Sequence, residues 1–355
     1  MIPLDSIDRT TPAGKRTTER LPALKRQLTE QIPRRTLSET LLLATWNIRE
    51  FDSAAYGERL DESFLYIAEI VSRFDLVAIQ EVREDLKALD RLTALLGPWW
   101  RYIATDVTEG KPGNRERMAM LFDSRKVRFS GVSGEVVIPP VAVKVKGASG
   151  KTKTVYEPAR QLSRTPFLAG FKAGWFRFML CTVHVAYGEG KKDDAIRRVE
   201  IEEVARFLAK RADEAQAWSE NMILLGDFNI FSPDDVTLTA ITDQGFVVPE
   251  QLQGLPANAK KNRYYDQIAV RLREQRPVLD ANSPAGVLDY FQSVYREEDE
   301  KLYTKDIGPA YRRTQQGKQR TAARKRTYYR TYWRTHQMSD HLPMWVELRI
   351  EDAAG

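Results

Sequence analysis

The sequence predicts a layered fold of the α/β or α+β class, and three observations support this. Short apolar runs typical of buried strands alternate with segments of helical spacing over the first third of the chain. No glycine-rich nucleotide-binding loop accompanies this alternation. Several apolar runs that lie far apart in the chain end in polar side chains suited to catalysis. If these side chains share one site, strands from both ends of the chain lie in one unit. We therefore expect one large domain, although 355 residues exceed the usual reach of a single core.

The composition is that of a globular protein with a weak preference for polyanionic partners. Apolar residues make up 42% of the chain and the formal net charge is +6, which excludes the disordered class. The single cysteine, Cys181, lies in an apolar run and is interpreted as an inert core residue. No segment has the character of a signal peptide or of a membrane-spanning helix, so a cytoplasmic location is the default expectation.

The N-terminal segment differs from the rest of the chain. Residues 1–40 are polar, with scattered prolines and basic residues, so we expect a basic N-terminal extension outside the core. A short amphipathic piece at 21–32 is long enough for one helix. The core is expected to begin at Leu41 and to continue to residue 350 as a single domain.

The core elements follow from the spacing of apolar residues. Strands are expected within the apolar runs 41–49, 76–82, 100–104, 118–122, 176–185, 222–225, 264–270 and 344–350. Helices are expected at 61–74, 85–96, 193–218, 234–244 and 287–295. Alternating valines at 141–145, followed by Gly147-Ala148-Ser149-Gly150, predict a hairpin insertion near 139–160 that projects from the body.

The stretch from Tyr311 to His336 has the most unusual composition and lies in an expected basic aromatic insertion near 305–336. It holds nine Arg or Lys and no Asp or Glu, interleaved with Tyr328, Tyr329, Tyr332 and Trp333. A charge run is usually a solvated face. Here, the absence of acids and the alternation of arginine with aromatic rings favour nucleic-acid contact through phosphate pairing and base stacking.

Hard oxygen ligands recur after the apolar runs. The run 222–225 is followed by Gly226, Asp227 and Asn229, and side chains two residues apart on an extended segment point the same way. An ordinary Asx turn explains these residues equally well when they are taken alone. Recurrence of the pattern favours a cation site, because carboxylate and amide oxygens suit Mg²⁺, with Mn²⁺ or Ca²⁺ as alternatives. The expected oxygen-rich shell comprises Asn47, Glu81, Asp227, Asn229 and Asp340.

Two of the three histidines, His184 and His341, end apolar runs. Phosphodiester hydrolysis needs a water made nucleophilic and a leaving oxygen protonated. Histidine titrates near pH ~6.5, so a pair divides the duties of base and acid at neutral pH. A lone histidine after a strand is usually a surface or core residue, but two in this context favour catalysis. The third, His336, lies in the basic stretch and is assigned no chemistry.

Together these motifs resemble the endonuclease/exonuclease/phosphatase superfamily, most closely the deoxyribonuclease I-like nucleases. The motifs, in the family's order, are Trp46-Asn47-Ile48-Arg49, Gln80-Glu81-Val82-Arg83, Glu116-Arg117, Arg164, His184, Gly226-Asp227-Phe228-Asn229, Tyr265-Asp266 and Ser339-Asp340-His341. The resemblance covers residues 41–350 apart from the two insertions. It implies an α+β (α/β sandwich) fold of two face-to-face mixed β-sheets flanked by helices, with the site on one edge. Secreted members of the family carry disulfides, whereas this chain has a single cysteine and cannot form a disulfide within itself.

The resemblance also implies a role for each matching residue. Glu116 would orient His184 and Asp266 would orient His341, so that two carboxylate–histidine pairs flank the scissile phosphate. The divalent cation would be held by Glu81 with Asn47, Asp227 and Asp340, and Asn229 would bind and polarise the phosphate. Arg49 and Arg164 would contact the DNA backbone, and we expect Arg324 and Arg326 of the basic stretch to bind the substrate as well.

We therefore expect a divalent-metal-dependent phosphodiester hydrolase, specifically a DNA endonuclease of low sequence specificity with a two-histidine mechanism. Arginine directly after Asn47-Ile48 and the arginine-aromatic stretch favour DNA. Other interpretations stay open: an apurinic-site repair nuclease, a phosphoinositide or sphingomyelin phosphodiesterase, an enzyme acting on RNA, or a nucleic-acid-binding protein with weak catalysis. The expected partner is nucleic acid, with no membrane contact, and the sequence points to no protein partner.

Overall fold

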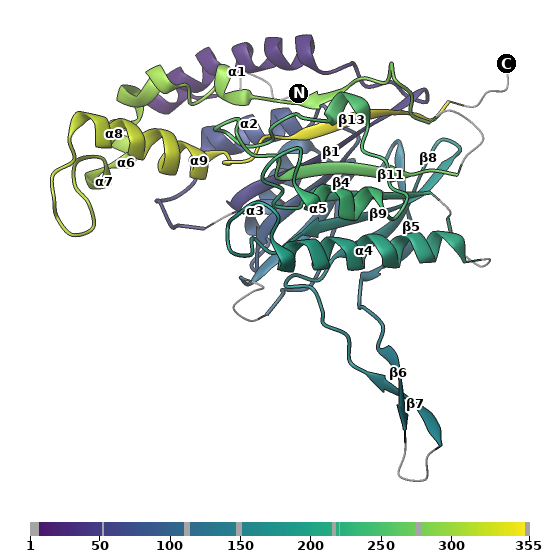
Figure 1. Cartoon of the computed structure of the whole chain (residues 1–355). Coiled ribbons are helices and arrows are strands. Elements are labelled where there is room, and N and C mark those ends of the chain that lie inside the picture. Colours follow the sequence, from purple (N-terminus) through teal and green to yellow (C-terminus); the bar gives the residue numbers. More distant parts are fainter. Residues whose placement is uncertain are drawn as a thin grey trace.

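The computed structural model describes residues 7–51, 53–109, 114–146, 151–214, 218–219, 221–273 and 278–351. Two mixed β-sheets pack face to face, and helices cover the outer face of each sheet (Figure 1). The α+β (α/β sandwich) class predicted from the sequence is confirmed. In the part of the chain that the structure describes, no helix combines the length and the apolar character needed to cross a membrane.

The larger sheet joins the two ends of the chain. It has six strands in the order β12-β13-β1-β2-β4-β3. Their bounds are β1 (Thr40–Phe51), β2 (Leu76–Arg83), β3 (Trp100–Ala104), β4 (Glu116–Asp123), β12 (Ala285–Val287) and β13 (Met344–Arg349). β1 runs parallel to β2 and antiparallel to β13. Residues near both termini therefore lie side by side at the centre of one sheet.

The second sheet has five strands in the order β11-β10-β9-β8-β5. Their bounds are β5 (Val127–Glu135), β8 (Phe167–Ala173), β9 (Phe176–His184), β10 (Met222–Asp227) and β11 (Asp266–Arg271). β9 and β10 are parallel, and the other neighbours are antiparallel. Because β10 pairs with β9 on one side and β11 on the other, the ends of three strands lie next to one another at one edge of this sheet.

The helices lie outside the two sheets. Their bounds are α1 (Pro12–Gln31), α2 (Asp61–Val71), α3 (Lys87–Leu96), α4 (Ala195–Asp213), α5 (Val236–Thr242), α6 (Thr304–Ile307), α7 (Pro309–Arg312), α8 (Ala322–Tyr328) and α9 (Arg334–Gln337). The first strand shows why the apolar runs are continuous: Leu41 and Leu43 face the second sheet, whereas Leu42 and Ala44 face the helix layer. A strand buried on both faces has no polar face to show.

Helix α1 corrects the expectation of an N-terminal extension outside the core. It begins at the cap residue Thr11, whose side chain accepts a hydrogen bond from the Gly14 amide, and it is longer than the predicted 21–32 helix. Leu21, Leu24 and Leu28 are fully buried against the outer face of the six-stranded sheet and α2. The sequence signal was weak because this narrow apolar stripe is diluted by many charged residues.

Replacing Leu24 by alanine is expected to lower the free energy of unfolding by about 2–4 kcal/mol, because it leaves a cavity in a fully buried position. Chemical denaturation monitored by circular dichroism measures the change. Leu37→Ala is the matched control, since Leu37 is 96% exposed and its truncation is expected to alter stability by less than about 0.5 kcal/mol. Equal stabilities of the two variants would mean that α1 does not belong to the folded core.

Two further sequence expectations differ from the structure. The predicted helix at 287–295 is instead the end of β12 followed by the short 3-10 turn Tyr290–Gln292. Its apolar residues are buried by tertiary packing rather than along one face of a helix. In α4, the sequence predicts an apolar stripe of Ile196, Val199, Val204, Phe207, Leu208 and Ala212. Val204, Leu208 and Ala212 are buried as predicted, whereas Ile196 and Val199 in the first turns are 37% and 46% exposed.

The predicted hairpin forms from β6 (Val141–Lys146) and β7 (Thr152–Glu157), and it projects far from the body of the protein (Figure 1). The predicted turn at 147–150 lies outside the described residues. The basic aromatic stretch folds as α7, α8, the π-helical turn Tyr329–Trp333 and α9. Tyr329 and Trp333 are buried in the core, so only Tyr328 and Tyr332 of the four interleaved aromatics expose their rings.

His336 ties α9 to the segment that follows β1, since its Nε2 lies 2.9 Å from the Ser53 carbonyl oxygen. Burial, reinforced by the neighbouring Arg59 and Arg49 and opposed by Glu50, lowers the pKa of His336 to about 4. The unfolded chain therefore binds this proton more readily, and the contribution to stability is complete above pH ~6.5 and lost as the pH falls towards 4. Denaturation at several pH values is expected to show a shallower acid loss for His336→Gln than for the wild type. Identical pH profiles would contradict this.

Candidate active site

The polar residues at the strand ends meet at one edge of the sandwich. In the five-stranded sheet, Asp227 of β10 is in register with His184 of β9 on one side and with Asp266 of β11 on the other. Gly226 permits the close approach of β9 and β10, because a Cβ at this position would lie 2.2 Å from the Val183 carbonyl oxygen. The sequence therefore places two carboxylates and an imidazole side by side on neighbouring strands.

The six-stranded sheet contributes Asn47 and Glu81 from the parallel strands β1 and β2. Both strands shift register at this point, and Glu81 has a φ of +61°. Such a bulge re-aims a side chain at the cost of local backbone strain. The Asn47 amide Nδ2 donates to Glu81 Oε1 and to Asp227 Oδ2, each at 3.0 Å. The backbone amide of Glu50 donates to the second Glu81 oxygen at 2.8 Å. Asn47 thus links the two sheets at the site.

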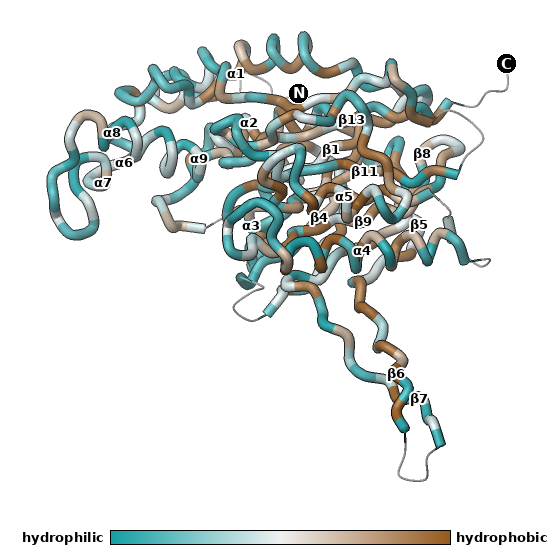
Figure 2. Tube along the Cα trace, in the orientation of Figure 1, coloured by the Kyte–Doolittle hydropathy of each residue, from teal (hydrophilic) through white to brown (hydrophobic). Residues whose placement is uncertain are grey.

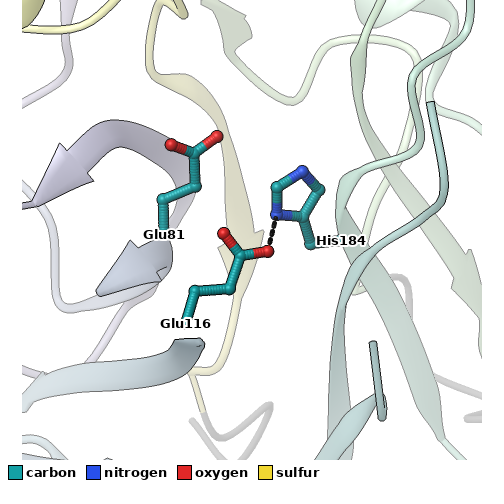
Figure 3. A group of neighbouring side chains, drawn as sticks. All are labelled: Glu81, Glu116 and His184. Atoms are coloured by element: carbon teal, nitrogen blue, oxygen red, sulfur yellow. Dashed lines mark ion pairs between the residues drawn. The ribbon is translucent and has the colours of Figure 1, made fainter. Parts of the chain in front are cut away.

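The first carboxylate–histidine pair lies between the sheets. Glu116, the first residue of β4, places Oε1 2.8 Å from His184 Nδ1. Figure 3 shows this pair joined and Glu81 facing the same space. The Arg164 guanidinium contacts the same Glu116 carboxylate. Because Nδ1 faces the carboxylate, His184 Nε2 points towards Asp227, whose Oδ2 lies 3.5 Å away.

The second pair has a similar arrangement and is hydrogen-bonded. His341 Nδ1 lies 2.7 Å from Asp266 Oδ2, and its Nε2 lies 3.7 Å from Asp227 Oδ2. The Tyr265 ring stacks on the imidazole with ring centroids 5.3 Å apart. The Ser339 hydroxyl accepts from the His341 backbone amide and donates to the Asn47 carbonyl oxygen, which fixes the loop before β13 against β1. Two imidazoles from different sheets therefore face one carboxylate oxygen.

Electrostatics give the two histidines opposite character. Burial and the Arg164 guanidinium lower the pKa of His184 to about 4, against the attraction of Asp227 and Glu81. Burial also acts to lower the pKa of His341, but the carboxylates of Asp266 and Asp227 outweigh it and hold that pKa well above its ordinary value. At neutral pH the site accordingly presents one neutral imidazole and one imidazolium, on either side of Asp227.

A hard divalent cation fits the donor atoms between the sheets. The carbonyl oxygen Oδ1 of Asn47 is buried and has no hydrogen-bond partner within the described part of the chain, although its amide nitrogen donates twice. Glu81 lies beside it, and one ligand atom each of Glu81, Glu116 and His184 lie within 4.8 Å of one another. Since the Glu116 oxygen already faces His184 and Arg164, Asn47 and Glu81 are the better cation ligands. Oxygen donors with open positions for water and phosphate are what Mg²⁺ prefers.

Of the remaining predicted site residues, Asn229 lies at this centre, whereas the others lie further away or point elsewhere. Asn229 has a φ of +53°, and its Nδ2 donates to the Val185 carbonyl oxygen, so it lies beside His184 and Asp227. Asp340 is half-buried and lines a neighbouring cleft of about 580 Å³ rather than joining the Glu81 cluster. Arg49 donates to the Thr335 hydroxyl at 2.9 Å and packs on Tyr56, so it faces α9. Arg324 and Arg326 are exposed on α8.

Two contributors to the geometry carried no predicted role, although both stood inside quoted motifs. Tyr265 precedes Asp266 and covers one face of His341. Ser339 lies two residues before His341 and binds the backbone on both sides of the site. Their positions next to Asp266 and two residues before His341 were visible in the sequence. Serine and tyrosine are common residues, however, and only the fold shows that they position the His341 imidazole and its loop.

Comparisons with known proteins agree with this geometry. A family model described as "Endonuclease/Exonuclease/phosphatase family" matches residues 44–341. A protein named Deoxyribonuclease, from Thioalkalivibrio sp. (strain K90mix), is 30% identical over 195 residues, which span 54% of this chain and 46% of the relative. This chain therefore covers less than half of the relative's length.

Solved structures share the fold at low sequence identity. A humanized D. rerio TDP2 superposes with a TM-score of 0.51 and 12% identity, covering 87% of this chain and 98% of that one. The mannosyl-6-phosphatase Bt3783 of Bacteroides thetaiotaomicron VPI-5482 gives a TM-score of 0.51 at 17% identity, covering 87% and 99%. These similarities establish the architecture of the two sheets.

Proposed function

The chain belongs to the endonuclease/exonuclease/phosphatase family, and we propose that it is a divalent-metal-dependent phosphodiesterase that cuts DNA as an endonuclease of low sequence specificity. The observation that carries this proposal is the pair of carboxylate–histidine couples facing Asp227. The Nε2 atoms of His184 and His341 lie 3.5 and 3.7 Å from the same Asp227 oxygen. Phosphodiester hydrolysis requires a general base for the attacking water and a general acid for the leaving oxygen, both positioned at the same phosphate.

The roles follow from the atoms that face the centre. His184 Nδ1 lies 2.8 Å from the Glu116 carboxylate, which favours the tautomer with the proton on Nδ1 and leaves a lone pair on Nε2 to accept a proton from the attacking water. His341, held by Asp266, presents an Nε2–H that protonates the leaving oxygen. Asn229 and Arg164 lie beside His184 and bind the non-bridging phosphate oxygens. A cation held by Asn47 and Glu81, with Asp227 beside them, neutralises charge on the phosphoryl group when bound.

DNA is the substrate class with most support. The Thioalkalivibrio relative carries the name Deoxyribonuclease. The stretch from Tyr311 to His336 has nine basic residues and no acidic ones, and Arg324 and Arg326 are exposed on its surface. Some of this charge is compensated, since Arg330 and Arg334 approach Glu297 at 3.8 and 3.6 Å, and Arg326 approaches Glu300 at 3.9 Å. The remaining exposed cations suit a phosphate backbone.

Neutralising the exposed end of α8 with Arg324→Gln, Lys325→Gln and Arg326→Gln is expected to weaken duplex binding and to reduce its salt dependence. Each phosphate that the protein no longer neutralises reduces the slope of log affinity against log salt by about 0.9, so three substitutions reduce it by about 1 to 3. Fluorescence anisotropy between about 50 and 200 mM salt measures the slope. Lys172→Gln with Lys210→Gln is the control, because both lysines are exposed at the opposite edge of the fold. An unchanged slope would mean that α8 faces away from DNA.

A panel of substrates tests the proposed activity. We expect Mg²⁺-dependent nicking of supercoiled plasmid that stops on addition of chelator. An abasic oligonucleotide and a water-soluble phosphoinositide, tested under the same conditions, represent the repair-nuclease and lipid-phosphodiesterase alternatives. Preference for the abasic site over intact plasmid would assign a repair nuclease. Hydrolysis of the phosphoinositide without cleavage of plasmid would overturn the assignment to DNA.

A further inference from the structure

The β6–β7 hairpin is a two-stranded ribbon that extends away from the sandwich, so both of its faces are open to solvent (Figure 1). Val141 is 57% and Tyr156 71% exposed. Isolated two-stranded ribbons are only marginally stable in water. A ribbon of this kind, with large exposed apolar side chains, is therefore expected to have a binding partner.

The cross-strand register separates the ribbon into two faces. Val143 lies opposite Val155, and Val141 and Val145 share that face with Glu157 and Lys153, so its centre is apolar and its two ends are charged. Figure 2 shows hydrophobic and hydrophilic residues interspersed along the hairpin. Lys144 and Lys146 lie on the other face, opposite Thr154 and Thr152. Lys153 is opposite Val145, so the outer half of the ribbon carries lysine on both faces.

The outer part of the ribbon carries charge of one sign, whereas Glu157 lies at its base, opposite Val141. From residue 136 to residue 156 the sequence contains four lysines and no aspartate or glutamate. All four, Lys144, Lys146, Lys151 and Lys153, are exposed. This segment is distinct from the basic stretch near α8, and it complements a polyanion.

The base of the ribbon is fixed at the active-site edge. The Gln161 side chain bonds both the amide and the carbonyl of Ile138, and Ile138 itself is buried. Glu200 of α4 then accepts from the Ser163 amide and, through its other oxygen, from the Ala186 amide two residues after His184. Arg164, the next residue, contacts Glu116. The segments that lead into and out of the ribbon are thus anchored near the His184 pair, and the ribbon itself projects away from it.

We propose that the hairpin is an arm that lies in a groove of double-stranded DNA beside the scissile phosphate. This inference rests on the proposed function in that it takes DNA as the substrate. Two strands about 4.8 Å apart, each of six paired residues or about 20 Å, fit the major groove, which is about 12 Å wide and accepts a two-stranded ribbon. The lysines of the outer half pair with phosphates on either side, and the valine face packs into the groove.

The test is duplex binding by the variant Lys144→Gln, Lys146→Gln, Lys151→Gln and Lys153→Gln. Anisotropy with a 30-base-pair duplex (about three helical turns) in chelator separates binding from hydrolysis. At about 150 mM salt we expect at least a tenfold loss of affinity, and a slope of log affinity against log salt that is smaller by about 2 to 4. Hydrolysis of a small chromogenic phosphodiester is expected to stay at the wild-type rate, since these lysines are far from the histidine pairs. The control is again the Lys172→Gln and Lys210→Gln variant.

The outcomes separate the arm from the proposed function. Wild-type affinity and slope in the lysine variant would overturn the arm, even if the protein cuts DNA. Conversely, a wild-type protein that hydrolyses neither plasmid nor the small diester, but binds duplex through these lysines, would overturn the nuclease and leave the arm in place. If the lysine variant keeps its DNA affinity but changes its sedimentation from an oligomer to a monomer, the ribbon is instead an interface between copies of this chain.

Discussion

His341→Ala is expected to lower kcat for plasmid hydrolysis by about 10²–10⁴, the usual contribution of a general acid or base. The expectation follows from the geometry of the pair: Asp266 fixes His341 Nδ1 at 2.7 Å, so that Nε2 is presented to the reaction centre. His184→Ala is expected to have a loss of similar size, because Glu116 fixes that imidazole in the same way. Duplex binding in chelator is expected to stay within about threefold of the wild type for both variants, because neither imidazole is a main phosphate contact.

The control for these variants is His336→Ala, which removes a buried histidine that contacts Ser53 rather than the reaction centre. Its kcat is expected to stay close to that of the wild type when measured at pH 7 under conditions where circular dichroism shows it folded. If His184→Ala and His341→Ala both cut plasmid at the wild-type rate, the two-histidine mechanism is wrong. An equal loss in His336→Ala would show that the effect comes from packing.

Glu81→Gln is expected to reduce activity at about 1 mM Mg²⁺ by at least 10², with partial recovery as the Mg²⁺ concentration rises. Glutamine keeps the shape and an acceptor for the Glu50 amide, but it removes the charge from the side chain beside the unpaired Asn47 oxygen. Hard cations are held chiefly by carboxylates, so the neutral amide weakens the site. Two measurements test the weaker Mg²⁺ binding. The Mg²⁺ concentration for half-maximal rate is expected to rise, and the increase in melting temperature caused by Mg²⁺ is expected to shrink.

Glu84→Gln is the matched control, since Glu84 follows Glu81 closely in the chain but is exposed and pairs with Arg115. It is expected to keep the Mg²⁺ dependence of the wild type. Stabilisation by Mg²⁺ that persists unchanged in Glu81→Gln would place the cation elsewhere, with the Glu116–His184 pair as the next candidate.

The fold class and the clustering of distant residues were predictable because they follow from simple rules. Runs such as 41–44 and 222–225 are continuously apolar, since sheets packed between another sheet and helices bury both faces. Polar residues at the ends of such runs mark the edge where strands finish. The pairing of Glu116 with His184 came from the resemblance rather than from spacing, and the structure places these side chains 2.8 Å apart.

Other features depend on tertiary packing that the local sequence does not encode. The bulge that turns Glu81 into the site follows from a register shift between three strands. Arg49 donates to Thr335 and packs on Tyr56, contacts that its motif did not indicate, and its contact with the DNA backbone stays a prediction. Half of the aromatic residues interleaved in the basic stretch, Tyr329 and Trp333, are core residues rather than stacking platforms. In each case the residue type fits both environments, and only the fold decides between them.

Two carboxylate–histidine pairs are proposed to act together on one phosphodiester. The most direct test is the rate at which supercoiled plasmid is nicked in Mg²⁺. This rate is compared for the wild type, the two single histidine variants and the double variant His184→Ala with His341→Ala. Groups that act as a unit are strongly non-additive. We predict that the double variant is within about tenfold of the slower single variant. If the loss of rate in the double variant equals the product of the two single losses, or if the double variant cuts at the wild-type rate, the two histidines do not act as a unit.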